Sequence, residues 1–409
     1  MSMDVVLSKT PATQPRQRTA MASKAVICAF AATSILSTNI FLPSLPAIAA
    51  DLRVSSAAVT STITIFLAIV AVGQLIAGPL SDRLGRKMPI LIGLCIFVLG
   101  TMWCAFAADL PGLLIGRSIQ AAGACVFVVL ARAIARDLFD GEQLASTMAW
   151  ITIATAAAPG FSPLLGSALD HLFGWRVEFG FVAAFAIGAG AAYATFVGET
   201  KAASVRSVRP VGMAGTYLGL MRDARFAAPA RIASLMMAGL FAVFSAAPRI
   251  LLEGLGLSPV MLGLLFACVV FLVFGAGILA PKLSARFGLH RATRIGLVTA
   301  SAGGVALLLA VLLARNSLPP FLAAASVFLF GLGIVSPLLS AAALSPFGDR
   351  AGAAAALFGF AQMTGAACGA SLAAVLATDP AIGLGTVLAP TSLFALFLSF
   401  RKNEASSVA

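Results

Sequence analysis

The chain has 409 residues, of which 60% are hydrophobic and only 10% are charged, and its mean hydropathy is +1.02. Soluble domains carry about 25% charged residues, so this composition excludes an ordinary soluble protein. The net charge of +12 would indicate nucleic-acid binding in a soluble chain, but in a membrane protein it indicates basic segments on one membrane face.

Apolar stretches long enough to cross the hydrocarbon core, which takes about 20 residues, recur from Val26 to Phe400. Alternating strands of about ten residues are absent, so helices and not a barrel are expected. We therefore predict an all-α membrane protein with twelve transmembrane helices in two six-helix pseudo-repeats. The expected spans are residues 24–48, 57–80, 88–108, 110–133, 145–169, 175–197, 227–250, 259–281, 292–314, 319–344, 350–376 and 380–400.

The distribution of basic residues predicts the orientation of these spans. With both termini inside, the outer loops hold only Arg53, Arg176, Arg249 and Arg315, and Arg117 lies within a span. The remaining basic residues of the 27 fall on the inner side, as expected for a protein with cytoplasmic termini. This asymmetry explains the positive charge without a nucleic-acid partner.

The longest polar interval separates two halves. The expected organisation is a cytoplasmic tail (1–23), a six-helix half (24–197), a central cytoplasmic loop (198–226), a second six-helix half (227–400) and a tail (401–409). Within the central loop, Thr216–Arg225 predicts a short amphipathic helix on the membrane surface.

The two halves carry the same pattern at a constant offset. Pro46, Asp51, Ser56, Gly73 and Pro79 in the first half correspond to Pro248, Glu253, Ser258, Gly275 and Pro281 in the second. Two parallel repeats around a central cavity predict alternating access by rocking of one half against the other.

A basic loop follows the second span and recurs in weakened form as Ala280–Gly288. Asp82 can cap the start of the third span or of a facing helix, and Gly85 allows a tight turn. A purely topogenic loop is the alternative, but an acid among bases has no role in orientation. We expect the loop to act as a conformational latch, formed by Gly78, Asp82, Arg83, Gly85, Arg86 and Lys87.

Arg117 is the basic residue predicted to lie inside a span. A guanidinium there is costly and usually faces the bundle interior, a cavity or a partner. Gln120 lies one turn further on the same face. The alternative is that the Arg117 side chain reaches the outer surface, because Asp109 is only two turns away.

The fifth span contains Pro159, Gly160, Pro163 and Gly166. Small residues allow close helix approach and prolines bend a helix, so this pattern predicts a kinked, tightly packed helix. An ordinary kinked membrane helix would show the same residues.

Five segments lie in this order along the chain: Ser37–Pro46, Gly78–Lys87, Arg117–Gly123, Ala158–Gly166 and Tyr217–Phe226. Together they resemble the major facilitator superfamily, and within it the twelve-span drug:proton antiporters of the bicyclomycin/chloramphenicol-resistance branch. The resemblance implies a basic loop that latches the halves in the outward-open state and an Arg117 that couples substrate binding to proton release. It also implies an antiporter-type motif at Pro159–Gly166, and a monomer.

The chain departs from that family at Asn39, where related antiporters have an acid. No expected span centre carries a carboxylate. Three hypotheses follow: coupling through a peripheral acid such as Asp82 or Glu178, proton exchange by another route with an anionic or neutral substrate, or facilitated diffusion. A cationic substrate is disfavoured because no acid in the cavity would balance it.

The expected function is export of small amphipathic compounds, neutral or weakly charged, across the bacterial inner membrane, with the proton gradient as the energy source implied by the resemblance. The expected binding and coupling residues are Asn39, Arg117 and Gln120, and the second half contributes possible cavity lining by Met236, Phe241, Phe358 and Gln362. The alternative is a dedicated metabolite or siderophore permease on the same scaffold. No hydrolase, metalloprotease or P-loop motif is present, so no enzyme, cofactor or metal is expected; the partners are the substrate, protons and the bilayer.

Overall fold

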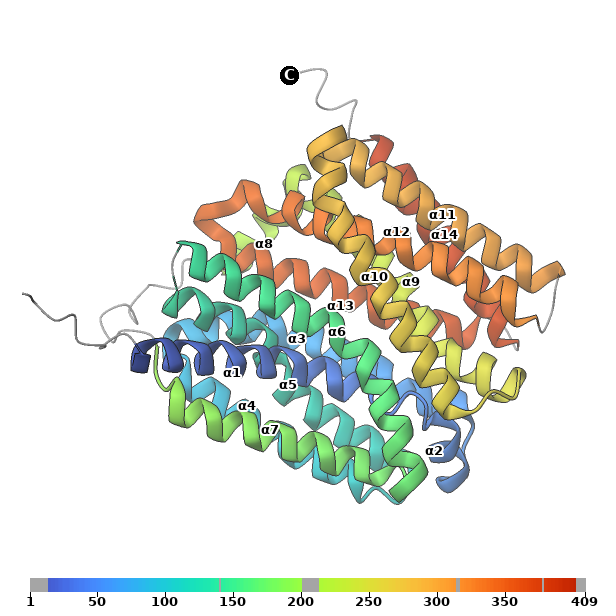
Figure 1. The fold of residues 1–409 in the computed structure, drawn as a ribbon, viewed down its shortest axis with the longest axis horizontal. Helices are drawn as coiled ribbons and strands as arrows, with labels where there is room; N and C mark the ends of the chain where they lie inside the picture. Colours follow the sequence, from blue (N-terminus) through green and yellow to red (C-terminus); the bar gives the residue numbers. More distant parts are fainter. Residues whose placement is uncertain (1–13, 140, 201–212, 314–316, 377–378, 402–409) are drawn as a thin grey trace, which may run out of the picture.

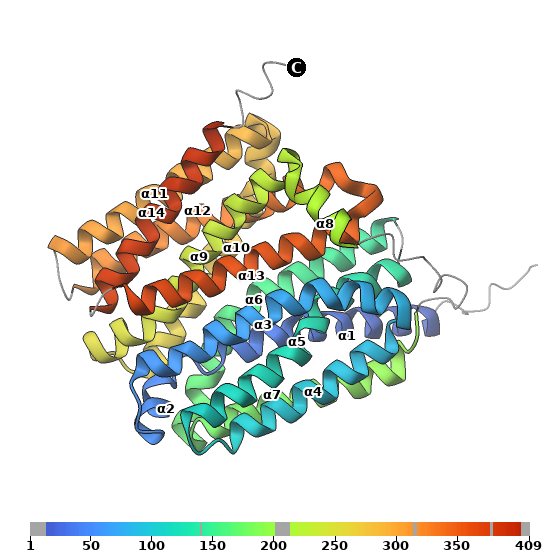
Figure 2. The same ribbon diagram turned by 180° about the vertical axis from the view of Figure 1, so that it is seen from behind.

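The structure is a computed structural model that describes residues 14–139, 141–200, 213–313, 317–376 and 379–401. These residues form helices and no strands, arranged as an elongated bundle (Figures 1 and 2). In chain order the elements are α1 (Gln14–Asn39), α2 (Leu45–Asp51), α3 (Ser56–Leu84), α4 (Lys87–Ala105), α5 (Leu110–Leu138), α6 (Gly141–Phe173), α7 (Arg176–Phe196), α8 (Met213–Arg222), α9 (Ala224–Pro248), the π-helical turn η2 (Arg249–Gly254), α10 (Pro259–Phe287), α11 (Leu289–Leu313), α12 (Leu318–Leu344), the 3-10 segment η3 (Ser345–Arg350), α13 (Ala351–Val375) and α14 (Pro380–Arg401).

Each expected span falls on a long helix, so the prediction of an all-α membrane protein is confirmed. Within the described residues, eleven helices are long and apolar enough to cross a membrane. The helix α6, with 33 residues, takes the place of the fifth expected span. The predicted amphipathic helix in the central loop corresponds to α8, while residues 201–212 of that loop lie outside the described part of the chain.

The first expected span differs from the structure at both ends. The helix α1 begins at Gln14, inside the expected tail, and ends at Asn39 instead of continuing to residue 48. The chain is non-helical at residues 40–44 and resumes in α2. Pro43 and Pro46 explain this, because proline lacks an N–H donor and restricts the residue before it. We call residues 40–44 the α1–α2 break.

The internal repeat is visible in the backbone. The helices α3 and α10 both have 29 residues, and the Ser55 and Ser258 side chains cap their first turns. Both helices stop at a glycine with positive φ, +84° at Gly85 and +79° at Gly288, where a residue with a side chain would be strained. The bundle therefore has two ends, which we call the basic end, where the α3–α4 turn lies, and the α2 end.

Two seams join the halves, one where α3 packs along α13 and one where α6 packs along α10 (Figures 1 and 2). At the first seam the hydroxyls of Ser371 and Thr64 lie 3.1 Å apart. At the second, a Cβ on Gly263 would lie 2.8 Å from the Cα of Leu164, so the helices touch backbone to backbone. The Tyr217 hydroxyl of α8 donates to the Leu75 carbonyl of α3 at 3.3 Å, which ties the central linker to the first seam.

The first seam is testable by crosslinking. In a cysteine-free background, Thr64→Cys combined with Ser371→Cys should crosslink under mild oxidation, since the native hydroxyls are in hydrogen-bond contact. A protease site inserted between residues 201 and 212 would then leave the two halves joined on a non-reducing gel. Thr64→Cys with Thr391→Cys, on α14, is the matched control and should separate after cleavage. Separation of the first pair as well would show that α3 and α13 do not pack in this way.

Candidate functional site

Arg117 is buried inside the first half. Its side chain is 0% exposed, so the alternative in which it reaches the membrane surface is not what the structure shows. Its Nη1 donates to the Ser37 carbonyl of α1 at 2.9 Å and to Gln120 Oε1 at 2.6 Å. Gln120 Nε2 in turn donates to the Thr101 hydroxyl of α4 at 2.8 Å. The predicted pair of Arg117 and Gln120 therefore lies at the junction of α1, α4 and α5.

Two aromatic rings cover the guanidinium. Its carbon lies 4.5 Å from the Phe41 ring centroid and 4.3 Å from that of Phe66, distances at which cation–π attraction operates. The Nε and Nη2 atoms of Arg117 are buried without hydrogen-bond partners. The described contacts of this charge are thus a carbonyl, an amide oxygen and two ring faces, and none of them is an acid.

Asn39 does not contact Arg117 in this structure. Its side-chain Nδ2 donates to the Ile35 carbonyl of its own helix at 2.8 Å, and the residue is 2% exposed. Asn39 is the last residue of α1, and its amide turns back onto a carbonyl one turn earlier in the same helix. Arg117 therefore bonds to the nearby Ser37 carbonyl and not to Asn39 in this structure.

The antiporter-type motif lies on α6 and has a packing function at both glycines. A Cβ on Gly160 would lie 2.6 Å from the Cβ of Val270 on α10. A Cβ on Gly166 would lie 1.7 Å from the Ile40 carbonyl oxygen, in the α1–α2 break. Pro159 and Pro163 are inside the helix, as expected. The motif thus lets α6 approach the second half at one position and the α1–α2 break at the other.

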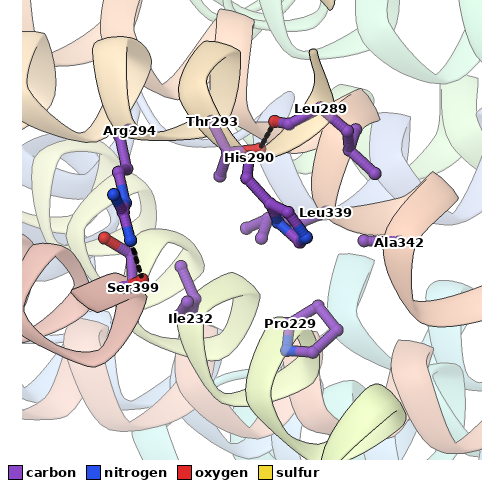
Figure 3. A pocket seen from close by; sticks show the side chains of 9 residues that line it. All are labelled: Pro229, Ile232, Leu289, His290, Thr293, Arg294, Leu339, Ala342 and Ser399. Atoms are coloured by element: carbon purple, nitrogen blue, oxygen red, sulfur yellow. Dashed lines mark hydrogen bonds between the residues drawn. The ribbon is translucent and has the colours of Figure 1, made fainter. Parts of the chain in front are cut away.

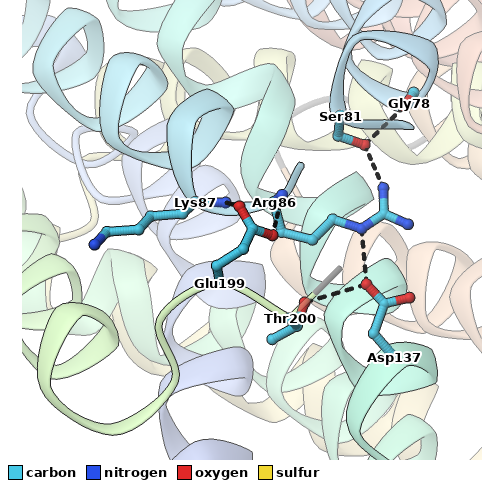
Figure 4. A network of polar contacts seen from close by, with 7 residues as sticks. All are labelled: Gly78, Ser81, Arg86, Lys87, Asp137, Glu199 and Thr200. Carbon is cyan, nitrogen blue, oxygen red and sulfur yellow. Dashed lines mark hydrogen bonds and ion pairs between the residues drawn. The ribbon is translucent and has the colours of Figure 1, made fainter. Parts of the chain in front are cut away.

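The basic loop forms a polar network at the basic end (Figure 4). Arg86 is 7% exposed; its Nε pairs with Asp137 at 2.8 Å and its Nη1 donates to the Ser81 hydroxyl at 2.7 Å. Ser81 in turn donates to the Gly78 carbonyl at 2.7 Å. The Asp82 and Arg83 side chains, which the latch prediction also involves, lie outside the described part of the structure.

Glu199 is a residue of this network that the sequence analysis did not single out. Its carboxylate accepts from the backbone N–H groups of Arg86 at 2.9 Å and Lys87 at 3.3 Å, so it caps α4 (Figure 4). The cap expected from Asp82 is thus provided at α4 by a residue from the start of the central linker. Thr200 adds a hydrogen bond to Asp137 at 3.1 Å. These contacts of Ser81, Arg86, Asp137, Glu199 and Thr200, which we call the Arg86 network, join α3, α4, α5 and the linker within the first half.

Two cavities are described. One, of about 600 Å³, lies on the first half between α1, α6 and α7. Its lining is Ala32, Leu36, Ala154, Ala158, Phe161, Ser162, Leu164, Leu165, Ala168, Phe181 and Phe185. Its only hydroxyl, on Ser162, is bonded to the Ala158 carbonyl, so the walls are apolar.

The other cavity, of about 40 Å³, lies at the basic end of the second half around His290 and Arg294 (Figure 3). Arg294 donates to the Ser399 carbonyl at 3.2 Å there. This space holds a few waters and not a drug-sized molecule.

The expected lining residues of the second half lie outside both cavities. Met236 and Phe358 are buried at 2% and 5% exposure, while Phe241 and Gln362 are half-buried. The Phe241 and Phe244 rings of α9 lie edge to face at 6.0 Å, and Phe244 meets Phe266 of α10 at 5.2 Å, so this region is aromatic packing between α9 and α10. Within the described residues, no three His, Cys, Asp or Glu side chains gather to hold a metal ion.

A bundle of two related six-helix halves, joined along two seams, with a buried charge beside a helix break, defines the class of secondary membrane carriers. Comparison with known proteins agrees. Residues 27–403 match the Major Facilitator Superfamily, and the chain belongs to that family.

Curated relatives cover most of the chain. It is 29% identical to multidrug resistance protein D of Escherichia coli (strain K12), over 86% of this chain and 87% of that protein. It is 30% identical to a chloramphenicol resistance protein of Pseudomonas aeruginosa, over 79% of this chain and 76% of that protein. A peptide transporter crystallised with sulfate shares the fold, with a TM-score of 0.74 at 13% identity over 95% of this chain and 94% of that one. The chain is thus a multi-pass membrane protein homologous to bacterial multidrug transporters.

Arg117 should not tolerate its nearest charged replacement. Arg117→Lys keeps the charge but cannot reach Ser37 and Gln120 together while lying flat between two rings. We expect a loss of stability of about 2 kcal/mol and loss of transport. Arg136→Lys, at an exposed position of the same helix, is the control and should melt like the wild type in detergent. Equal melting of both variants would contradict the assigned role.

The ion pair in the Arg86 network should contribute more to the free energy of unfolding than an exposed charge beside it. Asp137→Asn leaves a nearly buried guanidinium without its counter-charge and should cost about 3 kcal/mol. Lys87→Gln removes a neighbouring exposed charge and keeps the backbone contact, so its expected effect is below about 1 kcal/mol. Denaturant unfolding of the two purified variants gives the comparison, and a smaller effect of Asp137→Asn than of Lys87→Gln would rule the network out as a stabilising element.

Proposed function

We propose that this transporter exports small amphipathic compounds, neutral or weakly charged, out of the cytoplasm of a bacterium. The observation that carries the proposal is the apolar cavity of about 600 Å³ between α1, α6 and α7. Ligand pockets for drug-sized molecules measure about 300–1,000 Å³ and are mainly apolar. The two relatives reported above are named for drug resistance, which supports the same substrate class.

The position of the cavity supports a role in transport. Leu36 lines it, and the next residue, Ser37, accepts the Arg117 hydrogen bond. Phe161 of the same lining is 53% exposed and stacks edge to face on Phe271 of α10 at 6.0 Å. A molecule in the cavity therefore adjoins both the α1–α2 break and the second seam, the two places where the first half moves if the halves rock.

The orientation in the proposal places the basic end in the cytoplasm, with both termini there. It follows from the distribution of basic residues, which concentrate at that end of the bundle. In this orientation the α2 end faces the outside. The Ser56 hydroxyl of α3 donates to Glu253 of η2 at that end, which is a hydrogen bond between the two halves.

The chemistry of the first half favours neutral or anionic over cationic substrates. Arg117 is a fully buried base of that half, and its described contacts include no acid. Asn39 contributes an amide where an acid would balance a cation. The same features carry a second candidate, a dedicated permease for a metabolite or siderophore, for which an unbalanced guanidinium would suit an anionic group.

The proposed carrier is a monomer that catalyses no reaction and binds no cofactor. Its partners are the substrate, the bilayer and protons. Energy comes from the proton gradient, as in the drug:proton antiporters that the chain resembles.

The experiment is a susceptibility panel in a host without its own efflux pumps, covering phenicols, bicyclomycin, fluoroquinolones and lipophilic cations. Cells with the wild type should resist a neutral phenicol roughly tenfold better than a lipophilic cation, because the cavity offers a cation no counter-charge. Arg117→Ala should abolish protection, while Arg136→Ala, exposed on the same helix, should keep it. Better resistance to the cation would contradict the charge argument, and no protection against any compound would favour the permease.

A further inference from the structure

Glu178, near the start of α7, is the one Asp or Glu among the described residues that is fully buried, at 0% exposure. Its Oε1 accepts a hydrogen bond from the Ser44 hydroxyl, and its Oε2 has no hydrogen-bond partner. Ser44 is itself 0% exposed. It stands at the N-cap position of α2 but does not cap that helix, because its hydroxyl is directed at Glu178. The carboxyl and the α1–α2 break are thus in direct contact.

A second acid faces the same hydroxyl. Asp170, near the end of α6, lies within hydrogen-bonding reach of Ser44 and interacts electrostatically with Glu178. Asp170 is half-buried, and the next residue, His171, is exposed and interacts with it. A serine hydroxyl has one proton to donate, so it cannot satisfy two carboxylates at once.

The cations of this region are directed elsewhere. Arg176 lies two residues before Glu178, but it pairs with Asp51 of α2 and donates to the Ala107 carbonyl at 3.1 Å. That pairing lowers the pKa of Asp51, which lies outside the membrane spans. Arg117 lies over the Phe41 ring, and that ring packs at a tilt on Phe179, the residue after Glu178, with centroids 6.1 Å apart.

The remaining elements packed against α7 bring no compensating charge to this end. The only charged residue of α4 is Lys87, at its opposite end. The charged residues of α1 are Arg16, Arg18 and Lys24, all in its first half and toward the basic end. Asp109, at the start of α5, accepts from the Gly112 N–H at 2.8 Å. Two acids that face one hydroxyl, with no ion pair to an Arg or Lys in the described part of the chain and only the exposed His171 beside Asp170, form a site that holds a proton.

We propose that Glu178 is a proton-binding site of this transporter, completed by Ser44 and Asp170, and that its protonation controls the α1–α2 break. The inference rests on the proposed function only in giving the proton its role in driving export. A proton taken up by Asp170 from outside passes to Ser44 Oγ as the serine hydroxyl gives its own proton to Glu178 Oε1. Asp170 is then ionised again, Ser44 is unchanged and Glu178 is neutral.

The break transmits the protonation state to Arg117. Deprotonated Glu178 would place a second negative charge beside Asp170 in a dry site. We expect this repulsion to push α7 and α6 apart at the two acids, and Ser44, which is bonded to Glu178, to move with its segment. That segment also carries Phe41, which covers Arg117, and it directly follows the last turn of α1, where Ser37 accepts the Arg117 hydrogen bond. Since a Cβ on Gly166 would collide with the Ile40 carbonyl, the segment also has little room to move independently of α6.

The first test requires no substrate. Purified protein in lipid nanodiscs is compared by infrared difference spectroscopy between acidic and alkaline buffer, following the C=O stretch of protonated carboxyls. We expect a band from a protonated carboxyl at neutral pH that Glu178→Gln removes and Ser44→Ala or Asp170→Asn shifts. Glu253→Gln is the matched control, since Glu253 is also held by a serine at the α2 end but is exposed. A band that persists in Glu178→Gln, or no such band in the wild type, would overturn the proposal.

The second test separates the proton site from the proposed function. In proteoliposomes, Glu178→Gln should keep substrate exchange within about twofold of the wild type but lose accumulation driven by a pH gradient by about tenfold or more. Loss of exchange and accumulation together, with normal folding, would make Glu178 structural and contradict the coupling role. If the wild type exchanges no compound of the panel, the proposed function fails, while the infrared result still decides the proton site.

Discussion

The structure depends on how the first helix is allowed to end inside the protein. A buried helix end has no access to water, so a carbonyl that it frees needs another donor. The helix α1 ends at Asn39, and the carbonyls of its last turn lose their helical partners. Arg117 donates to the carbonyl of Ser37, and Asn39 turns its own amide back to Ile35. A guanidinium stabilised by ring faces and a carbonyl therefore makes the break possible, and the break in turn gives the buried charge a partner.

The α1–α2 break and the end of α1 before it contact several features that we connect with transport. Arg117 of α5 lies against Phe41 and donates to Ser37, Gly166 of α6 lies against Ile40, and Glu178 of α7 accepts from Ser44. The apolar cavity begins at Leu36, one residue before the Arg117 acceptor. Because a packed interior transmits displacement, a change of charge at one contact of this segment reaches the others. A rigid helix through residue 48 would have offered no such element.

Hydropathy and charge predicted most of the fold. Spans are the easiest element to find, because about 20 apolar residues are needed to cross the bilayer, and the repeat of Pro, Gly and Ser positions reappears as the matched caps and turns of α3 and α10. The α1–α2 break escaped detection because Pro43 and Pro46 lie in an otherwise apolar window.

Contacts between distant residues were harder to foresee. Glu199 caps α4 from 112 and 113 positions along the chain, and no local pattern announces such a pair. Glu178 was weighed only as one peripheral acid among several, since its burial depends on how α2, α6 and α7 meet. Arg117 and Gln120 were found because a charge inside a span is conspicuous in any sequence.

The central claim is that the protein is a carrier in which a proton moves one way and an uncharged drug the other. The most direct measurement is simultaneous recording of labelled chloramphenicol and internal pH in proteoliposomes of the purified wild type under an imposed pH gradient. The account predicts that the drug accumulates on the side with more protons, that internal pH changes only when drug is present, and that an uncoupler abolishes both. Drug movement that equilibrates without any dependence on the gradient would contradict proton coupling and make the protein a facilitated-diffusion carrier.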